Sequence, residues 1–221
     1  MNTTVKTKRS PGRPAGGADA RDRLLTAATE SIAEQGIAAS SFATIAKRAG
    51  LTPAMMHYYF RDRDHLLDCV VEERLAALIA SVWDPVEAGA HPAEAIAGIV
   101  DRLLRGVERM PWIPATWMRE VLNEGGLLRT RVLQRLPFEK VRQISQTIAQ
   151  GQRKRTVNPE IDPVMIVFST IGLVMLHAAT AGFYAQTFHR RRPGRATLRR
   201  HIAGLLRHGL DAPQGGARQR K

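Results

Sequence analysis

The stretch that decides the fold covers residues 42–67 and reads FATIAKRAGLTPAMMHYYFRDRDHLL. Its first half places apolar residues at the i, i+3, i+4, i+7 spacing of one helical face: Phe42, Ile45, Ala46 and Ala49. Gly50 supplies the left-handed residue that ends such a helix. Thr52 is a preferred N-cap and Pro53 a preferred first helical residue, so another short helix begins at once. Two short helices joined by a tight glycine-containing turn predict a helix-turn-helix.

Helices on either side complete this unit. An earlier helix is predicted to begin at Asp19, which can cap it, and to end at Gly36. After the helix-turn-helix, Asp62 can cap a longer helix that ends near Trp83. Residues 1–18 are polar, lack periodicity and are expected to form a flexible arm.

The remainder of the chain is predicted to be helical as well. Prolines divide it into stretches with helical character, and no stretch shows the sustained alternation of a strand. The predicted helices cover about 92–110, 112–123, 126–135, 137–153, 162–187 and 195–209. We therefore predict an all-α protein, with a basic arm (1–18), a helix-turn-helix domain (19–66), a larger helical domain (67–210) and a basic tail (211–221).

Charge is distributed unevenly along the 221 residues, whose formal net charge is +13. Residues 1–66 carry 10 Lys+Arg against 6 Asp+Glu, residues 67–185 carry 13 against 13, and residues 186–221 carry 10 against 1. A neutral middle between basic ends indicates that the ends meet a polyanion, although basic tails also serve solubility alone.

Several functional classes are excluded or disfavoured. The single cysteine, Cys69, excludes an internal disulfide framework and a cysteine-rich metal site, and it fits a reducing compartment. The first 20 residues contain no apolar segment typical of a secretory signal, so we expect a cytoplasmic protein. No nucleophile–base spacing, HExxH, GxSxG or phosphate-binding loop occurs, so we expect no enzyme, cofactor or metal.

Residues 164–185 form a run of 22 residues without a formal charge, which is long enough to span a bilayer. Polar residues interrupt it, and glycine and alanine supply much of its apolar character. A helix that is apolar all round is also expected inside a protein or between subunits. We favour that interpretation and expect no membrane span.

Residues 23–67, and 42–67 above all, resemble the N-terminal DNA-binding domain of the TetR family of transcriptional regulators. The features that carry the resemblance are the pairs Ile45-Ala46 and Ala49-Gly50, the capping Thr52, the aromatic run 57–60 and the charged run 61–64. The resemblance is strong over about a fifth of the chain. Beyond residue 67, only length, helical content and a small-residue-rich segment near the end agree.

The second short helix is expected to be the recognition helix, which enters the DNA major groove with its N-terminal residues. Its expected base contacts come from Pro53, Ala54, Met55 and His57. Phosphate contacts are expected from Ser41, Thr52 and Tyr58. The resemblance adds Arg63, because the family usually has a lysine close to a phosphate there. Arg13 either enters an A·T-rich minor groove or lies in a solvated tail, and the aromatic residues either contact DNA or pack the small domain.

The resemblance also implies a homodimer whose larger domain binds a small molecule. Two helices per subunit, 163–187 and 195–209, are expected to build the interface. Its candidate residues are Gly172, Leu176, Ala179, Phe183, Leu198, Ile202 and Leu205. Candidate residues of an apolar effector pocket are Trp112, Trp117 and Met118, although the same residues also suit an ordinary core. Arg119 and Glu120 are expected to form an ion pair.

The sequence therefore favours a DNA-binding regulator, a repressor released from a palindromic duplex operator by a small apolar ligand. Two alternatives stay open: a helix-turn-helix regulator without a small-molecule effector, and a membrane-associated helical protein.

Overall fold

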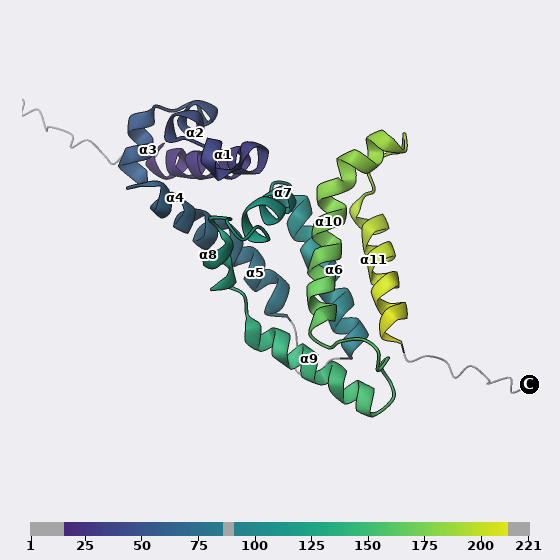
Figure 1. Cartoon of the computed structure of the whole chain (residues 1–221). Helices are drawn as coiled ribbons and strands as arrows, with labels where there is room; N and C mark the ends of the chain where they lie inside the picture. Colours follow the sequence, from purple (N-terminus) through teal and green to yellow (C-terminus); the bar gives the residue numbers. More distant parts are fainter. Residues whose placement is uncertain (1–15, 86–90, 212–221) are drawn as a thin grey trace, which may run out of the picture.

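The computed structural model describes residues 16–85 and 91–211, and within these ranges the fold is built of helices. Three helices form a small N-terminal domain: α1 (Gly16–Ala39), α2 (Phe42–Ala49) and α3 (Pro53–Tyr59). Figure 1 shows them grouped at one end of the molecule. Together with the helix that follows at residue 63, they bury one apolar cluster. Its members include Leu24, Leu25, Ile45, Ala46, Met56, Phe60, Leu66 and Val70.

Two of the predicted local signals around the helix-turn-helix, Gly50 and Asp62, act as predicted, whereas Thr52 occupies the N-cap position of α3 without making a side-chain cap hydrogen bond. The Ser41 hydroxyl accepts a hydrogen bond from the backbone N–H of Thr44 at 3.1 Å, and the Asp62 carboxylate accepts one from that of His65 at 2.8 Å. Gly50 adopts the left-handed conformation at φ +66°. Both predicted limits of the first helix were wrong. It begins at Gly16, so Asp19 lies inside the first turn, where its charge complements the helix dipole, and it continues past a kink at Gly36 to Ala39.

A long, nearly continuous helix connects the two domains. It consists of α4 (Arg63–Val70), a π-helical turn η1 (Val71–Leu75) and α5 (Ala76–Trp83), where a single helix was predicted. Figure 1 shows it leaving the small domain and running down one side of the larger domain.

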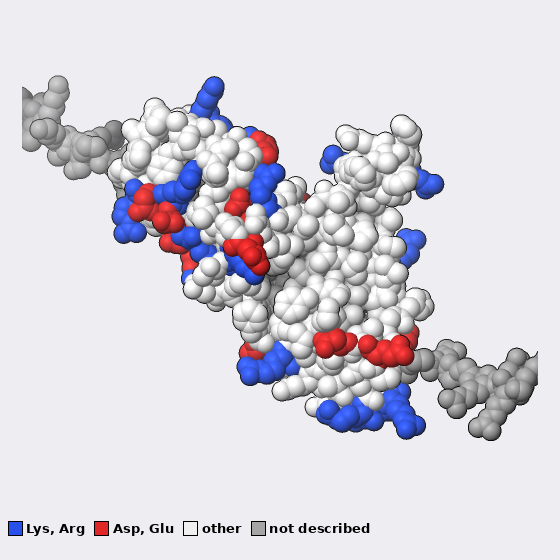
Figure 2. All heavy atoms as spheres, in the orientation of Figure 1, with Lys and Arg blue, Asp and Glu red and all other residues white. Residues whose placement is uncertain are grey.

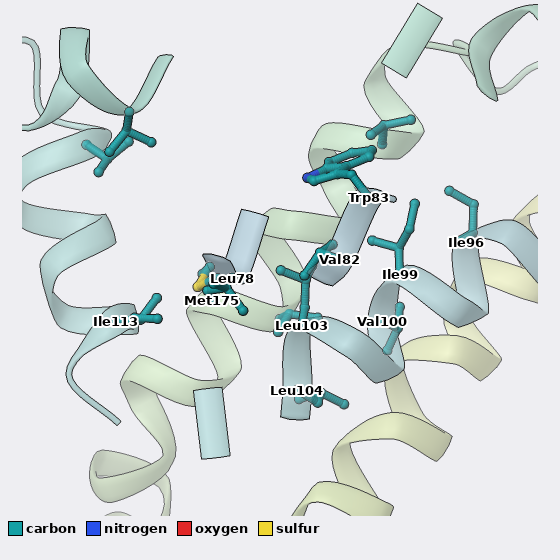
Figure 3. Close-up of a cluster of buried hydrophobic side chains, with 14 of the residues drawn as sticks. Leu78, Val82, Trp83, Ile96, Ile99, Val100, Leu103, Leu104, Ile113 and Met175 are labelled. Atoms are coloured by element: carbon teal, nitrogen blue, oxygen red, sulfur yellow. The ribbon is translucent and has the colours of Figure 1, made fainter. Parts of the chain in front are cut away.

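The larger domain contains the other helices of the described residues. They are α6 (Pro92–Arg109), α7 (Ile113–Thr116), the π-helical turn η2 (Trp117–Val121), α8 (Arg129–Leu133), α9 (Phe138–Arg153), α10 (Met165–Thr187) and α11 (Arg195–Leu210). Helix α6 lies at the centre, because α5, α9, α10 and α11 all pack against it. Figure 3 shows part of the resulting core, with Ile99, Val100, Leu103 and Leu104 along α6. The all-α prediction is confirmed for the described part of the chain.

Helix α10 has two different sides. One side is buried in the protein's own core and carries Ile166, Val167, Thr170, Val174 and Met175. The other side exposes large apolar residues: Met165, Phe168, Leu176, Phe183 and Tyr184. By length and composition, α10 is the one helix of the described residues that could cross a membrane, and 28% of its apolar window is buried.

Candidate functional site

Helix α3 presents a compact exposed surface at the outer end of the small domain. Its inward residues Met56 and Phe60 are fully buried, so the opposite side of the helix is fixed toward solvent. Residues predicted to contact DNA are exposed on that side: Thr52, Pro53, Ala54, His57 and Tyr58. Tyr58 is 81% exposed. Met55 differs from the prediction, because it is half-buried and packs against the domain core.

Aromatic contacts hold this surface in place. The His57 ring lies 5.1 Å from the ring of Phe42 on α2, and the Tyr58 ring meets Tyr59 edge-on at 4.8 Å. Such pairs fix ring orientation and leave the polar atoms of His57 and Tyr58 available to solvent. Thr52 begins α3 without a side-chain cap hydrogen bond, so its hydroxyl is also available.

Charged groups beside α3 divide into paired and unpaired ones. Arg48 is engaged by Glu30 and Glu34 of α1, and hydrogen bonding to Glu34 is the main cause that raises the pKa of its guanidinium. Lys47, one residue earlier, is exposed and has no such partner within the described part of the chain. Sequence reasoning did not single out Lys47, although the lack of acidic residues around it at helical spacing was a signal. Arg13, the predicted minor-groove residue, lies outside the described residues.

Arg63, for which the resemblance implied a phosphate contact, has hydrogen-bond partners within the protein. Its guanidinium donates hydrogen bonds to the backbone carbonyls of Ile37 and Ala38, at 3.0 and 3.3 Å. These carbonyls lie at the end of α1, where helical groups lack intrahelical partners. Arg63 therefore ties the end of α1 to the start of α4.

The two domains meet at a kink in α1. Gly36 has φ +81°, a conformation that favours glycine, and it faces Arg119 and Glu120 of η2. The buried Glu120 carboxylate accepts hydrogen bonds from the backbone N–H of Ile37 at 3.2 Å and of Leu127 at 3.4 Å. Arg119 donates to the carbonyl of Ala33 at 3.3 Å.

The predicted Arg119–Glu120 ion pair is therefore wrong. Each side chain binds backbone groups instead, and Glu120 connects the turn η2 of the larger domain to the small domain.

Helix α8 binds the same connecting helix from outside. Arg131 bridges Asp64 at 2.8 Å and Asp68 at 2.7 Å, both on α4, and Arg135 pairs with Glu72. Hydrogen bonding to Asp68 is the main cause that raises the pKa of Arg131. Figure 2 shows the opposite charges mixed along this part of the surface.

An apolar cavity lies at the centre of the larger domain. Its volume is about 40 Å³, and Trp83, Ile113, Trp117, Ile171 and Met175 are among the residues that line it. Ligand pockets usually measure roughly 300–1,000 Å³, so this cavity would have to expand to admit a drug-sized molecule.

Of the three predicted pocket residues, only Trp117 lines this cavity. Met118 is 41% exposed, and Trp112 packs half-buried against the core without reaching the cavity wall. The structure therefore places neither of these two residues at this cavity. Trp83, which the sequence analysis did not select, takes a place in the wall.

The predicted dimer residues also separate into two groups. Gly172, Leu176, Ala179, Phe183 and Leu205 are exposed. Leu198 and Ile202 are buried inside the protomer, because that side of α11 packs on α6. Those two assignments were wrong: the residues belong to the protomer core. Figure 2 shows that the visible face of α10 is nearly free of charged side chains.

Comparison with known proteins supports the resemblance of the N-terminal domain to the TetR family. Residues 24–70 match the family described as bacterial regulatory proteins, tetR family. Over 98 residues the chain is 30% identical to the HTH-type transcriptional regulator BetI of Rhizobium meliloti, which covers 44% of this chain and 48% of BetI. Over 82 residues it is 37% identical to BetI of Stenotrophomonas maltophilia, and this alignment covers 37% of this chain and 42% of that BetI.

The chain thus matches these two relatives over less than half of their length. A solved structure, the ketosteroid transcriptional regulator KstR2 of Mycobacterium tuberculosis, superposes with a TM-score of 0.67 at 17% identity. The superposition covers 86% of this chain and 94% of the KstR2 chain, so the shared fold extends to the larger domain. All three proteins are named as transcriptional regulators.

Proposed function

We propose that the chain, whose residues 24–70 match the tetR family of bacterial regulatory proteins, is a ligand-responsive, DNA-binding transcriptional repressor. The observation that carries the proposal is the exposed outer side of α3, on a helix whose inner side is fully buried. A rigid, short helix with small residues at its start fits the major groove.

The expected target is a palindromic duplex, bound by a dimer in the cytoplasm. Two recognition helices related by a twofold axis read half-sites about 34–36 Å apart. Ala54 and the methylene part of Met55 suit thymine methyl groups, and His57 suits a base edge or phosphate. Tyr58, Thr52 and Lys47 suit phosphates.

The uncharged side of α10, together with Leu205 of α11, supports dimer formation through these two helices. Exposed apolar residues recur along α10 at alternating three- and four-residue steps, from Gly172 through Leu176 and Ala179 to Phe183. This spacing is typical of helices that pack side by side. A second copy of the chain is preferred over a bilayer as the covering partner, because the other side of α10 is buried in the core and would have to leave it to span a membrane.

Release from DNA is proposed to start at the apolar cavity. A ligand that enlarges the cavity displaces Trp117, the first residue of η2. Glu120, in the same turn, holds Ile37 at the end of α1, and Arg63 holds the adjoining carbonyls to α4. Movement of η2 therefore changes the position of the small domain and the spacing of the two recognition helices.

A second candidate, a regulator without a small-molecule effector, is favoured by one observation: the cavity is only about 40 Å³. Apolar compounds that neither change tryptophan fluorescence nor release DNA would support it.

The test of DNA binding is a titration of genomic or selected duplex fragments at several salt concentrations. We expect tight binding by a dimer and an affinity that falls steeply with salt, because phosphate contacts release counterions. A salt slope near zero on a bound duplex would contradict the proposed phosphate contacts. An effector that lowers DNA affinity must itself bind more weakly, by the same factor, when DNA is present.

A further inference from the structure

A second hollow lies between α5 and α6 and is separate from the apolar cavity. It is an open cleft of about 410 Å³, within the usual size range of ligand pockets. Its floor is mainly apolar, with Ala77, Leu78, Gly106 and Met110, while three arginines of α6 line one side: Arg102, Arg105 and Arg109. Their i, i+3, i+7 spacing places the three guanidinium groups along one side of the helix.

Within residues 16–85 and 91–211, these arginines outnumber the carboxylates that pair with them. Asp101 pairs with Arg105 at 2.8 Å, and it also lies 3.5 Å from Arg195. Arg102 donates to the backbone carbonyl of Val82 at 2.7 Å. Arg109 is exposed and has no hydrogen bond or ion pair to any part of the chain that the structure describes.

The pKa of Arg102 also indicates an excess of positive charge in the cleft. Burial, and then the charge of Arg105, lower the pKa of Arg102, against a smaller opposing effect of Asp101. A lowered pKa means that the cationic form is held at a cost, which a bound anion would relieve. Guanidinium groups present a planar set of donors that matches a carboxylate or a phosphate.

Leu78 forms the boundary between the cleft and the apolar cavity, because it lines both. It lies against the backbone of Gly106: a Cβ atom at that position would stand 2.2 Å from Leu78 Cδ1. Figure 3 labels Leu78 and Met175, and both line the cavity wall. Leu78 is thus the one residue that the linings of the cationic cleft and the apolar cavity share.

We infer that the effector of the proposed repressor is an amphiphilic anion with a single apolar chain. Its carboxylate or phosphate head binds Arg102, Arg105 and Arg109 in the cleft. Its chain passes Leu78 and enters the cavity between Trp83 and Trp117, which must widen to admit it. The inference rests on the proposed function for its regulatory meaning, but binding itself can be measured without DNA.

The direct test uses four ten-carbon probes below their micelle-forming concentrations: decanoate, decyl phosphate, decanol and decylammonium. Calorimetry with the full chain should show binding of one or both anions, with decanol about tenfold weaker, the loss expected for one charge-assisted hydrogen bond. Decylammonium should bind more weakly still. The tighter of the two anions identifies the head group as carboxylate or phosphate. Tryptophan fluorescence should change on binding, because Trp83 and Trp117 lie at the chain site.

The matched variants are Arg109→Gln and Arg153→Gln. Both remove one exposed arginine without a partner among the described residues, so both should fold normally, but only Arg109 lines the cleft. Arg109→Gln should weaken binding of the better anion about tenfold and leave decanol unchanged. Arg153→Gln should change neither.

Equal binding of decanol and the anions, or equal effects of the two variants, would overturn the inference. The same preparations are assayed for duplex DNA binding. Intact DNA binding without any anion binding would overturn the effector class alone. Anion binding by a chain that binds no duplex would instead overturn the proposed function and leave the site standing.

Discussion

At the scale of single residues, Arg63 stabilises the join between α1 and α4 through two backbone carbonyls. We expect Arg63→Ala to lower the free energy of unfolding by about 1–2 kcal/mol, because it removes charge-assisted hydrogen bonds at a largely exposed site. Urea denaturation of the full chain measures the change. The control is Arg61→Ala, whose side chain is 80% exposed and lies 3.7 Å from Asp62. Equal effects of the two substitutions would contradict the structural role of Arg63.

Tyr58 offers a residue-scale test of DNA contact that is independent of stability. Its side chain is 81% exposed, so Tyr58→Phe should change the free energy of unfolding by less than about 0.5 kcal/mol. Loss of the hydroxyl should weaken binding to every duplex by a similar factor, because phosphates carry no sequence information. Tyr59→Phe serves as the control, since Tyr59 is half-buried and packs the small domain. A changed base preference at unchanged overall affinity would refute the phosphate assignment.

At the scale of elements, the π-helical turn η2 joins the apolar cavity to the small domain. Glu120→Ala would leave the N–H groups of Ile37 and Leu127 without their acceptor. We expect the free energy of unfolding to fall by about 1–3 kcal/mol, the usual cost of an unsatisfied buried polar group. Thermal and urea unfolding measure this change.

The same variant should also weaken the coupling between the two domains. In Glu120→Ala, an effector should still bind but should change DNA affinity by a smaller factor than in the parent chain. Glu124→Ala is a suitable control, since Glu124 is exposed in the loop after η2. If the effector changed DNA affinity by the same factor in the parent chain, Glu120→Ala and Glu124→Ala, this would contradict coupling of the two domains through Glu120.

At the scale of the whole molecule, dimer formation depends on surfaces that the protomer leaves exposed. A Cβ atom at Gly172 would contact nothing within 4 Å, and Ala179 is exposed. Gly172→Leu and Ala179→Arg should therefore leave the protomer fold intact but place bulk or an unpaired charge in the interface. Sedimentation should show monomers or aggregates in place of dimers. Unchanged dimers in both variants would move the interface to another surface.

Much of the small domain could be predicted from the sequence, because its signals are local. Gly50 and Asp62 act on backbone groups within a few residues, and the apolar spacing of α2 fixes which side faces inward. The exposed side of α3 followed from the same reasoning. The helices of the larger domain were also predicted, since prolines and helical spacing mark their limits.

Only the tertiary structure decided which distant groups meet. Glu120 and Ile37 are 83 residues apart, so no local pattern pairs them. Helix α10 is apolar on both sides, and its periodicity therefore could not tell core from outer surface. Trp117 lines the cavity and Met118 is exposed, and the packing of α11 on α6 buries Leu198 and Ile202. The sequence determined the helices and the exposed side of α3; long-range packing decided the cavity, the cleft and the contact between domains, because these depend on how whole helices stack.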